Sequence, residues 1–128
     1  MQIVHGRAAG ATAQARGGTF TGTVYGDPVL PSTDGTTVNS VTFTPGARTY
    51  WHHHERGQLL VVTAGSGWVR AHGEAPQPLT VGDLVWTAPG ERHWHGAGPD
   101  SILTHLAVSL GTTTWLDEVS QAEYGEAG

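Results

Sequence analysis

The chain lacks both cysteine and lysine, and each absence excludes a class of chemistry. Without cysteine there can be no disulfide framework, thiolate metal site, iron–sulfur cluster or cysteine nucleophile. Without lysine there can be no Schiff-base catalysis and no phosphate-binding lysine of the P-loop type. The 128 residues instead carry six arginines, 11 acidic residues and eight histidines. Histidine is therefore the leading candidate for moving protons at neutral pH.

Positive charge and long apolar runs are also scarce. The net charge is −5 and the arginines are scattered, so the chain offers no basic stripe for nucleic acid. No apolar run approaches the roughly 20 residues that a membrane-spanning helix needs. The start, Met1 to Arg7, has no apolar core of a secretion signal. We expect a cytoplasmic protein that binds neither nucleic acid nor membrane.

Glycine and proline, by contrast, are abundant, with 19 and 7 residues. Such a composition is typical of many short strands joined by turns, and the length suits one domain over residues 1–128. An N-terminal arm is expected over about residues 1–18 and a tail over about 111–128. The expected strands cover residues 19–25, 38–43, 49–54, 58–63, 68–72, 79–81, 84–87, 93–95 and 102–110.

The expected fold class is all-β, an antiparallel sandwich or barrel, with turns at 26–28 and 64–67 among others. One helix signal stands near the end of the chain. Ser120 and Glu123 have the spacing of a capping box, in which each side chain bonds the backbone of the other residue. This pattern predicts one short C-terminal helical turn.

Two pairs of histidines share a strand face each. Residues two apart in a strand point to the same side, so His52 and His54 form one pair and His93 and His95 another, while His53 points away. Inside a barrel these pairs could bring three or four imidazoles onto one ion. Imidazole binds Mn, Fe, Co, Ni, Cu and Zn alike, so the ligands alone leave the metal open.

The residues around these pairs resemble the two sequence motifs of the cupin superfamily. Gly46, five residues, His52-x-His54, three residues, Gln58, six residues and Gly65 resemble the first motif. Gly82, five residues, Ala88-Pro89-Gly90, two residues and His93 resemble the second. The resemblance implies a jelly-roll barrel in which His52, His54, Gln58 and His93 bind a metal.

Gln58 stands where most cupins have Glu. Its carbonyl oxygen can bind a metal but brings no charge, so a divalent ion keeps its full charge. We expect weaker metal affinity and a stronger Lewis acid than in a cupin with Glu.

Several stretches are similar to the bacterial cupin-type hydroxynitrile lyases, which are manganese enzymes. They include residues 45–49, 90–97 and 104–107. The resemblance implies His105 as a catalytic base and His95 as a second histidine beside it. It also implies Mn(II) as the cofactor, with Fe(II), Zn(II) and Ni(II) as alternatives, and cleavage of small hydroxynitrile or carbonyl compounds.

Two other functions remain open at this stage. One is a metal-dependent dioxygenase, and the other is a non-catalytic barrel that binds a small metabolite. Substrate selection is expected at the inward positions Asn39, Val41, Leu60 and Ser109. By analogy with small cupins, we expect a homodimer or homotetramer.

Overall fold

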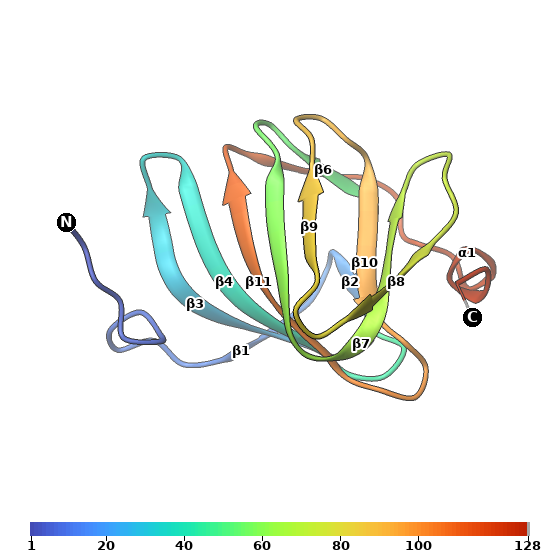
Figure 1. The fold of residues 1–128 in the computed structure, drawn as a ribbon, viewed down its shortest axis with the longest axis horizontal. Coiled ribbons are helices and arrows are strands. Elements are labelled where there is room, and N and C mark those ends of the chain that lie inside the picture. Colours follow the sequence, from blue (N-terminus) through green and yellow to red (C-terminus); the bar gives the residue numbers. More distant parts are fainter. Residues whose placement is uncertain (128) are drawn as a thin grey trace.

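The computed structural model describes residues 1–127 and builds them mainly from strands, as Figure 1 shows. Residue 128, the last of the expected tail, lies outside the described residues. The elements are β1 (Gln14–Arg16), β2 (Phe20–Thr21), β3 (Val24–Thr33), β4 (Thr36–Phe43), β5 (Arg48–Thr49), β6 (His52–His54), β7 (Gln58–Ala71), β8 (Gln77–Thr80), β9 (Leu84–Thr87), β10 (His93–Ala97), β11 (Leu103–Leu110), β12 (Thr113–Trp115) and α1 (Gln121–Gly125).

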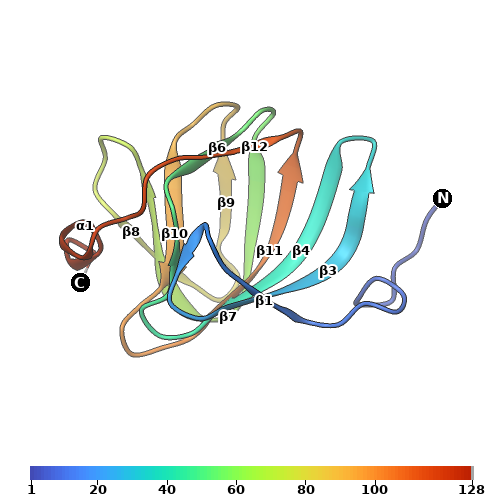
Figure 2. The ribbon, with the colours of Figure 1, turned by 180° about the vertical axis from the view of Figure 1, so that it is seen from behind.

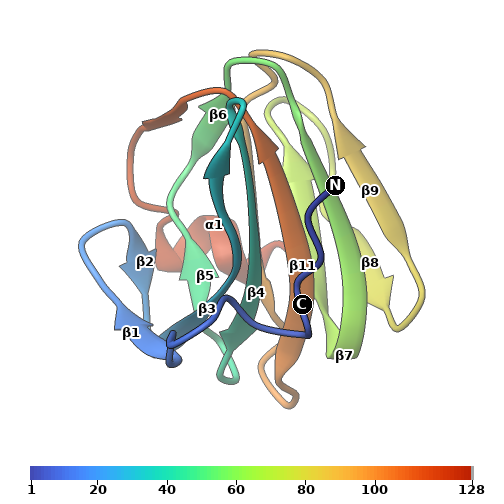
Figure 3. The ribbon, with the colours of Figure 1, turned by 90° about the vertical axis from the view of Figure 1, so that its left-hand side faces the viewer.

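The strands pair in antiparallel fashion and curl into a nearly closed barrel. The pairing order is β1-β3-β4-β11-β7-β10-β5-β2, with β8 and β9 on β7, and β6 between β10 and β12. Figure 3 shows β3, β4, β11 and β7 side by side in one wall. This architecture confirms the expected all-β antiparallel barrel with one short helix. No helix among residues 1–127 combines the length and apolar character needed to cross a bilayer.

The predicted turn at residues 64–67 is wrong, because β7 continues through it from one sheet to the other. Its first half pairs with β11 and its second half with β10. Gly65 has φ +73°, and a β-carbon there would overlap the carbonyl group of Ile102. A β-carbon on Gly67 would overlap the carbonyl oxygen of Gly96 in the same way. These glycines allow close strand approach at a bend, rather than a reversal of the chain.

Other strand boundaries also differ from the prediction. The expected turn at 26–28 is part of β3, where Pro28 lies opposite Asn39. On its other side β3 pairs with β1 only over Val24–Gly26, so the missing N–H of Pro28 removes no bond from that ladder. The strand expected over 49–54 is divided into β5 and β6. The strand expected over 19–25 is divided into β2 and the start of β3.

The segment after β11 runs back along the strands that carry the first histidine pair. Figure 2 shows it passing β12 and β6 on its way to α1. Backbone bonds join Trp51 to Leu116 and Asp117, and the buried guanidinium of Arg48 donates to the carbonyl oxygen of Val119. The predicted capping box is confirmed, because Ser120 and Glu123 bond each other's backbone N–H. The segment is therefore hydrogen-bonded to the chain around β5 and β6 along much of its length.

Two apolar clusters support the barrel. One lies inside it and includes Val24, Phe43, Val62 and Leu103. The other lies between the barrel and α1 and contains Trp51, Trp94, Val119, Tyr124 and Ala127. Trp51 thus faces away from His52, as strand alternation predicts.

Candidate metal centre

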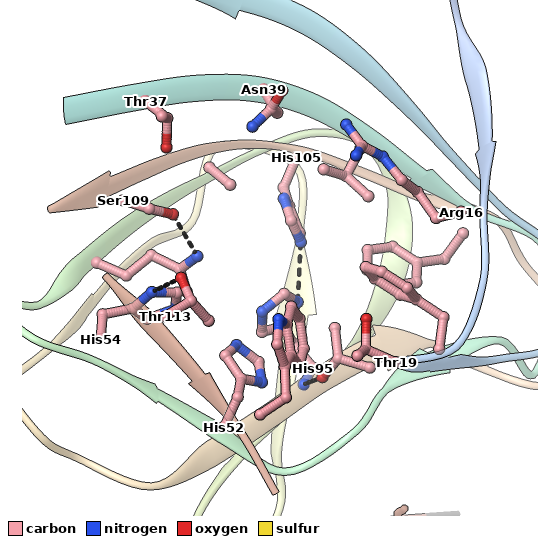
Figure 4. A pocket seen from close by; sticks show the side chains of 17 residues that line it. Arg16, Thr19, Thr37, Asn39, His52, His54, His95, His105, Ser109 and Thr113 are labelled. Carbon is pink, nitrogen blue, oxygen red and sulfur yellow. Dashed lines mark hydrogen bonds between the residues drawn. The ribbon is translucent and has the colours of Figure 1, made fainter. Parts of the chain in front are cut away.

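The barrel contains a cavity of about 280 Å³, and most of the predicted site residues line it. Figure 4 shows His52, His54, His95 and His105 around it. Gln58 also lines the cavity, and the fully buried His93 lies against it. The polar residues that complete the lining are Arg16, Thr19, Thr37, Asn39, Thr49, Ser109 and Thr113. Leu60 is buried but does not line the cavity, whereas the expected inward positions Asn39, Val41 and Ser109 do.

Strand register brings the two histidine pairs face to face. His52 on β6 lies directly opposite His93 on β10, with ring centroids 4.3 Å apart. One nitrogen each of His52, His93 and His95 lies within 4.8 Å of the others. Nitrogens bound to a single ion at about 2.1 Å lie about 3–4 Å apart. These three histidines could therefore bind a metal ion after a small contraction.

Backbone carbonyls fix the orientation of two of these rings. The Nδ1–H groups of His52 and His93 donate to the carbonyl oxygens of Tyr50 and Glu91, both at 2.8 Å. The Nε2 atoms then carry the lone pairs, which is the arrangement a metal ligand requires. The Nδ1 atom of His54 lies 3.0 Å from the Thr113 hydroxyl. Its Nε2 atom is buried without a hydrogen-bond partner among residues 1–127.

Gln58 contributes a further acceptor to the same place. Its amide nitrogen donates to the Ser109 hydroxyl at 3.0 Å, and its Oε1 lies 3.2 Å from Nε2 of His93. Because His93 carries its hydrogen on Nδ1, its Nε2 carries only a lone pair. The facing Oε1 of Gln58 likewise has lone pairs and no hydrogen. Two facing acceptors repel unless a cation or proton lies between them. The donor set of this site therefore fits a metal ion.

His95 also contacts His105 of β11 in the cavity wall, and these two residues are called the His95–His105 pair. Nε2 of His105 and Nδ1 of His95 are 3.0 Å apart, so one ring donates to the other. Both rings pack against Phe43, and both are buried. Their outer nitrogens, Nδ1 of His105 and Nε2 of His95, have no hydrogen-bond partner among the described residues. A proton can therefore pass from one ring to the other across this contact.

Burial keeps these histidines neutral. It lowers the pKa of His105 to about 4, and burial together with the neighbouring His93 lowers the pKa of His54 to about 4. The pKa of His95 falls well below its usual value because of burial and the neighbouring His105. Burial also lowers the pKa of His52 and of His93. Neutral imidazole is the form that binds metals and accepts protons.

The structure brings together all six residues that the sequence singles out, with one difference in grouping. His95, expected as a proton carrier, also lies within the cluster formed by His52 and His93. Sequence reasoning did not find Thr113, which orients His54, or Arg16 at the cavity wall. Thr113 carries no local motif that marks it, because its role depends on the pairing of β12 with β6.

A jelly-roll barrel that encloses histidines able to bind a metal defines the class of metal-binding cupin barrels. Comparison with known families agrees, because the Cupin domain family matches residues 39–108. The chain belongs to the cupin family. This confirms the resemblance that its two motifs suggested.

The chain is also similar to individual proteins of known name or structure. The chain is 47% identical over 111 residues to an (R)-mandelonitrile lyase from Granulicella tundricola, covering 82% of this chain and 85% of the relative. A solved cupin-like protein from Thermotoga maritima has a TM-score of 0.82 and 40% identity, covering 85% and 87% of the two chains. A polyketide cyclase from Streptomyces resistomycificus has a TM-score of 0.74 at 19% identity, covering 99% and 96%, and shares the fold.

Proposed function

We propose that this protein is a metal-dependent lyase that splits small α-hydroxynitriles into a carbonyl compound and hydrogen cyanide. The observation that carries this proposal is a cavity where oriented, neutral His52 and His93 and the amide oxygen of Gln58 lie beside the contact between His95 and His105. The similarity to an (R)-mandelonitrile lyase supports the same reaction.

The proposed ligands are His52, His54, Gln58 and His93. The free Nε2 of His54, the oriented Nε2 atoms of His52 and His93, and the facing Oε1 of Gln58 support this set. A bound divalent ion would polarise the hydroxyl oxygen of the substrate. We propose Mn(II), on the resemblance to manganese lyases, although Fe(II), Zn(II) and Ni(II) suit the same donors.

The His95–His105 pair would transfer the protons. In the productive tautomer, His105 Nδ1 carries a lone pair and takes the hydroxyl proton as the bond between the carbinol carbon and the nitrile carbon breaks. The proton on His105 Nε2 passes to His95 Nδ1, across the 3.0 Å contact. His95 Nε2–H gives its proton to cyanide, so that an aldehyde and hydrogen cyanide leave. Proton exchange with water restores the starting tautomers.

The test is cleavage of (R)-mandelonitrile by Mn(II)-loaded protein, followed by the absorbance of benzaldehyde. His105→Gln should lower kcat by a factor of about 100 or more, the usual contribution of a general base. His53→Gln is the matched control, because its side chain lies on the other face of β6 and is absent from the cavity lining. Lack of metal-dependent cleavage by the wild-type protein would refute the proposal.

Two other outcomes would identify the alternative functions. Oxygen uptake with an enol or catechol substrate, abolished under anaerobic conditions, would indicate a dioxygenase. Tight binding of a small metabolite without conversion would indicate a non-catalytic cupin.

A further inference from the structure

Arg16 places a permanent positive charge at the cavity and has no acidic partner among residues 1–127. It is the last residue of β1 and lines the cavity, and Figure 4 shows its guanidinium on the side bordered by Asn39 and His105. The two ion pairs formed within residues 1–127 use Arg7 and Arg70 instead. An arginine guanidinium stays charged in proteins and forms paired hydrogen bonds with carboxylates. The cavity wall thus carries an exposed guanidinium that forms no ion pair within residues 1–127.

The neighbouring strand leaves room for this guanidinium at one residue. A β-carbon added to Gly26 would overlap Nε of Arg16 and would lie 2.5 Å from one of its terminal nitrogens. The register places Gly26 opposite Gln14, two residues before Arg16. Gly26 therefore lets the arginine side chain lie flat across β3. A larger residue at that position would displace it.

The rest of the cavity favours an anion as well. Among the described residues, the lining contains no aspartate or glutamate, and its other polar groups are histidine, threonine, serine, asparagine and glutamine. Within the described part of the chain, no carboxylate in the cavity wall competes with a bound anion for Arg16. A divalent ion held by neutral ligands would add to the positive potential.

We infer that the preferred ligands of this cavity carry a carboxylate, which Arg16 binds, beside the hydroxyl or carbonyl group on which the site acts. This inference rests on the proposed function, because it assumes that substrate enters this cavity. It narrows the substrate class to small hydroxy or oxo compounds with an acid group.

The test compares two probes of the same size, (R)-mandelate and its neutral amide, by calorimetric titration of Mn(II)-loaded protein. The wild-type protein should bind mandelate about tenfold or more tightly than the amide, as expected for a charged hydrogen bond. Arg16→Met should remove most of this preference. Gly26→Ala keeps the charge but displaces it, and should reduce the preference several-fold. Arg56→Met, an arginine outside the cavity lining, should leave it unchanged.

Equal affinity of the wild-type protein for the two probes would overturn the inference. A preference that survives Arg16→Met would also overturn it, because the metal alone would then account for carboxylate binding. Failure of the proposed reaction gives a different result. In that case mandelonitrile is not cleaved, while the Arg16-dependent preference for mandelate persists.

Discussion

Acidification should destabilise the metal-free protein, because its buried histidines resist protonation. Burial lowers the pKa of His105 to about 4, against about 6.5 in an unfolded chain. Below pH 6.5 the unfolded chain therefore binds a proton that the folded protein does not. The stabilisation is complete above pH 6.5, falls as the pH drops, and is fully lost below pH 4.

The size of the effect follows from these two values. Between pH 7.5 and pH 5.5, His105 alone should lower the free energy of unfolding by about 1.3 kcal/mol. His54, with a pKa of about 4, should contribute a similar amount. The lowered pKa values of His52, His93 and His95 act in the same direction. Between these two pH values the free energy of unfolding of the wild-type protein should therefore fall by at least about 2.6 kcal/mol.

The measurement is urea unfolding of chelator-treated protein at the two pH values, followed by the fluorescence of its five tryptophans. His105→Gln removes one titrating group and should reduce the loss by about 1.3 kcal/mol. His5→Gln, on the exposed N-terminal arm, is the matched control and should keep the wild-type pH dependence. Equal wild-type stability at both pH values would refute the reasoning, as would an unchanged pH dependence in His105→Gln.

Four further predictions concern the metal, the fold and the assembly. Gln58→Glu should retain Mn(II) more tightly against a chelator and lower kcat for mandelonitrile, because a carboxylate neutralises part of the ion's charge; equal metal retention would contradict this. Gly65→Ala should cost at least about 2 kcal/mol in urea unfolding, since it combines φ +73° with a clash against Ile102. Tyr124→Phe should cost about 1 kcal/mol, because the hydroxyl donates to the buried carbonyl oxygen of Ala97 at 2.8 Å. Light scattering should give a mass of at least two 13.4 kDa chains, and the mass of a single chain would rule out the expected oligomer.

Strand alternation predicted the local geometry of the site well. It placed His52 with His54 and His93 with His95, because side chains two apart share a face whatever the partner strand is. It could not predict that His52 lies directly opposite His93, since that register depends on pairing between distant segments. For the same reason alternation could not predict that His95, which the resemblance assigns to proton transfer, lies within the cluster of His52 and His93.

The wrong turn at residues 64–67 has a clear physical cause. Glycine is frequent both in turns and where two backbones approach closely, and a sequence pattern does not separate these uses. The pattern around Gly65 and Gly67 predicts a turn, yet these glycines lie against Ile102 and Gly96 within one long strand. No sequence pattern predicts Arg16 at the cavity, because its position depends on the pairing of β1 with β3.

The segment after β11 has a consequence for how the protein matures. Thr113 orients His54, Trp115 packs on His52 with ring centroids 4.6 Å apart, and the backbone around Trp51 is bonded to residues 116 and 117. The first histidine pair is thus held in place by residues that the ribosome adds about sixty positions later. We expect these histidines to lack those contacts until residues 113–117 have been synthesised. Metal acquisition should then follow synthesis of residues 113–117, rather than accompany synthesis of the histidines themselves.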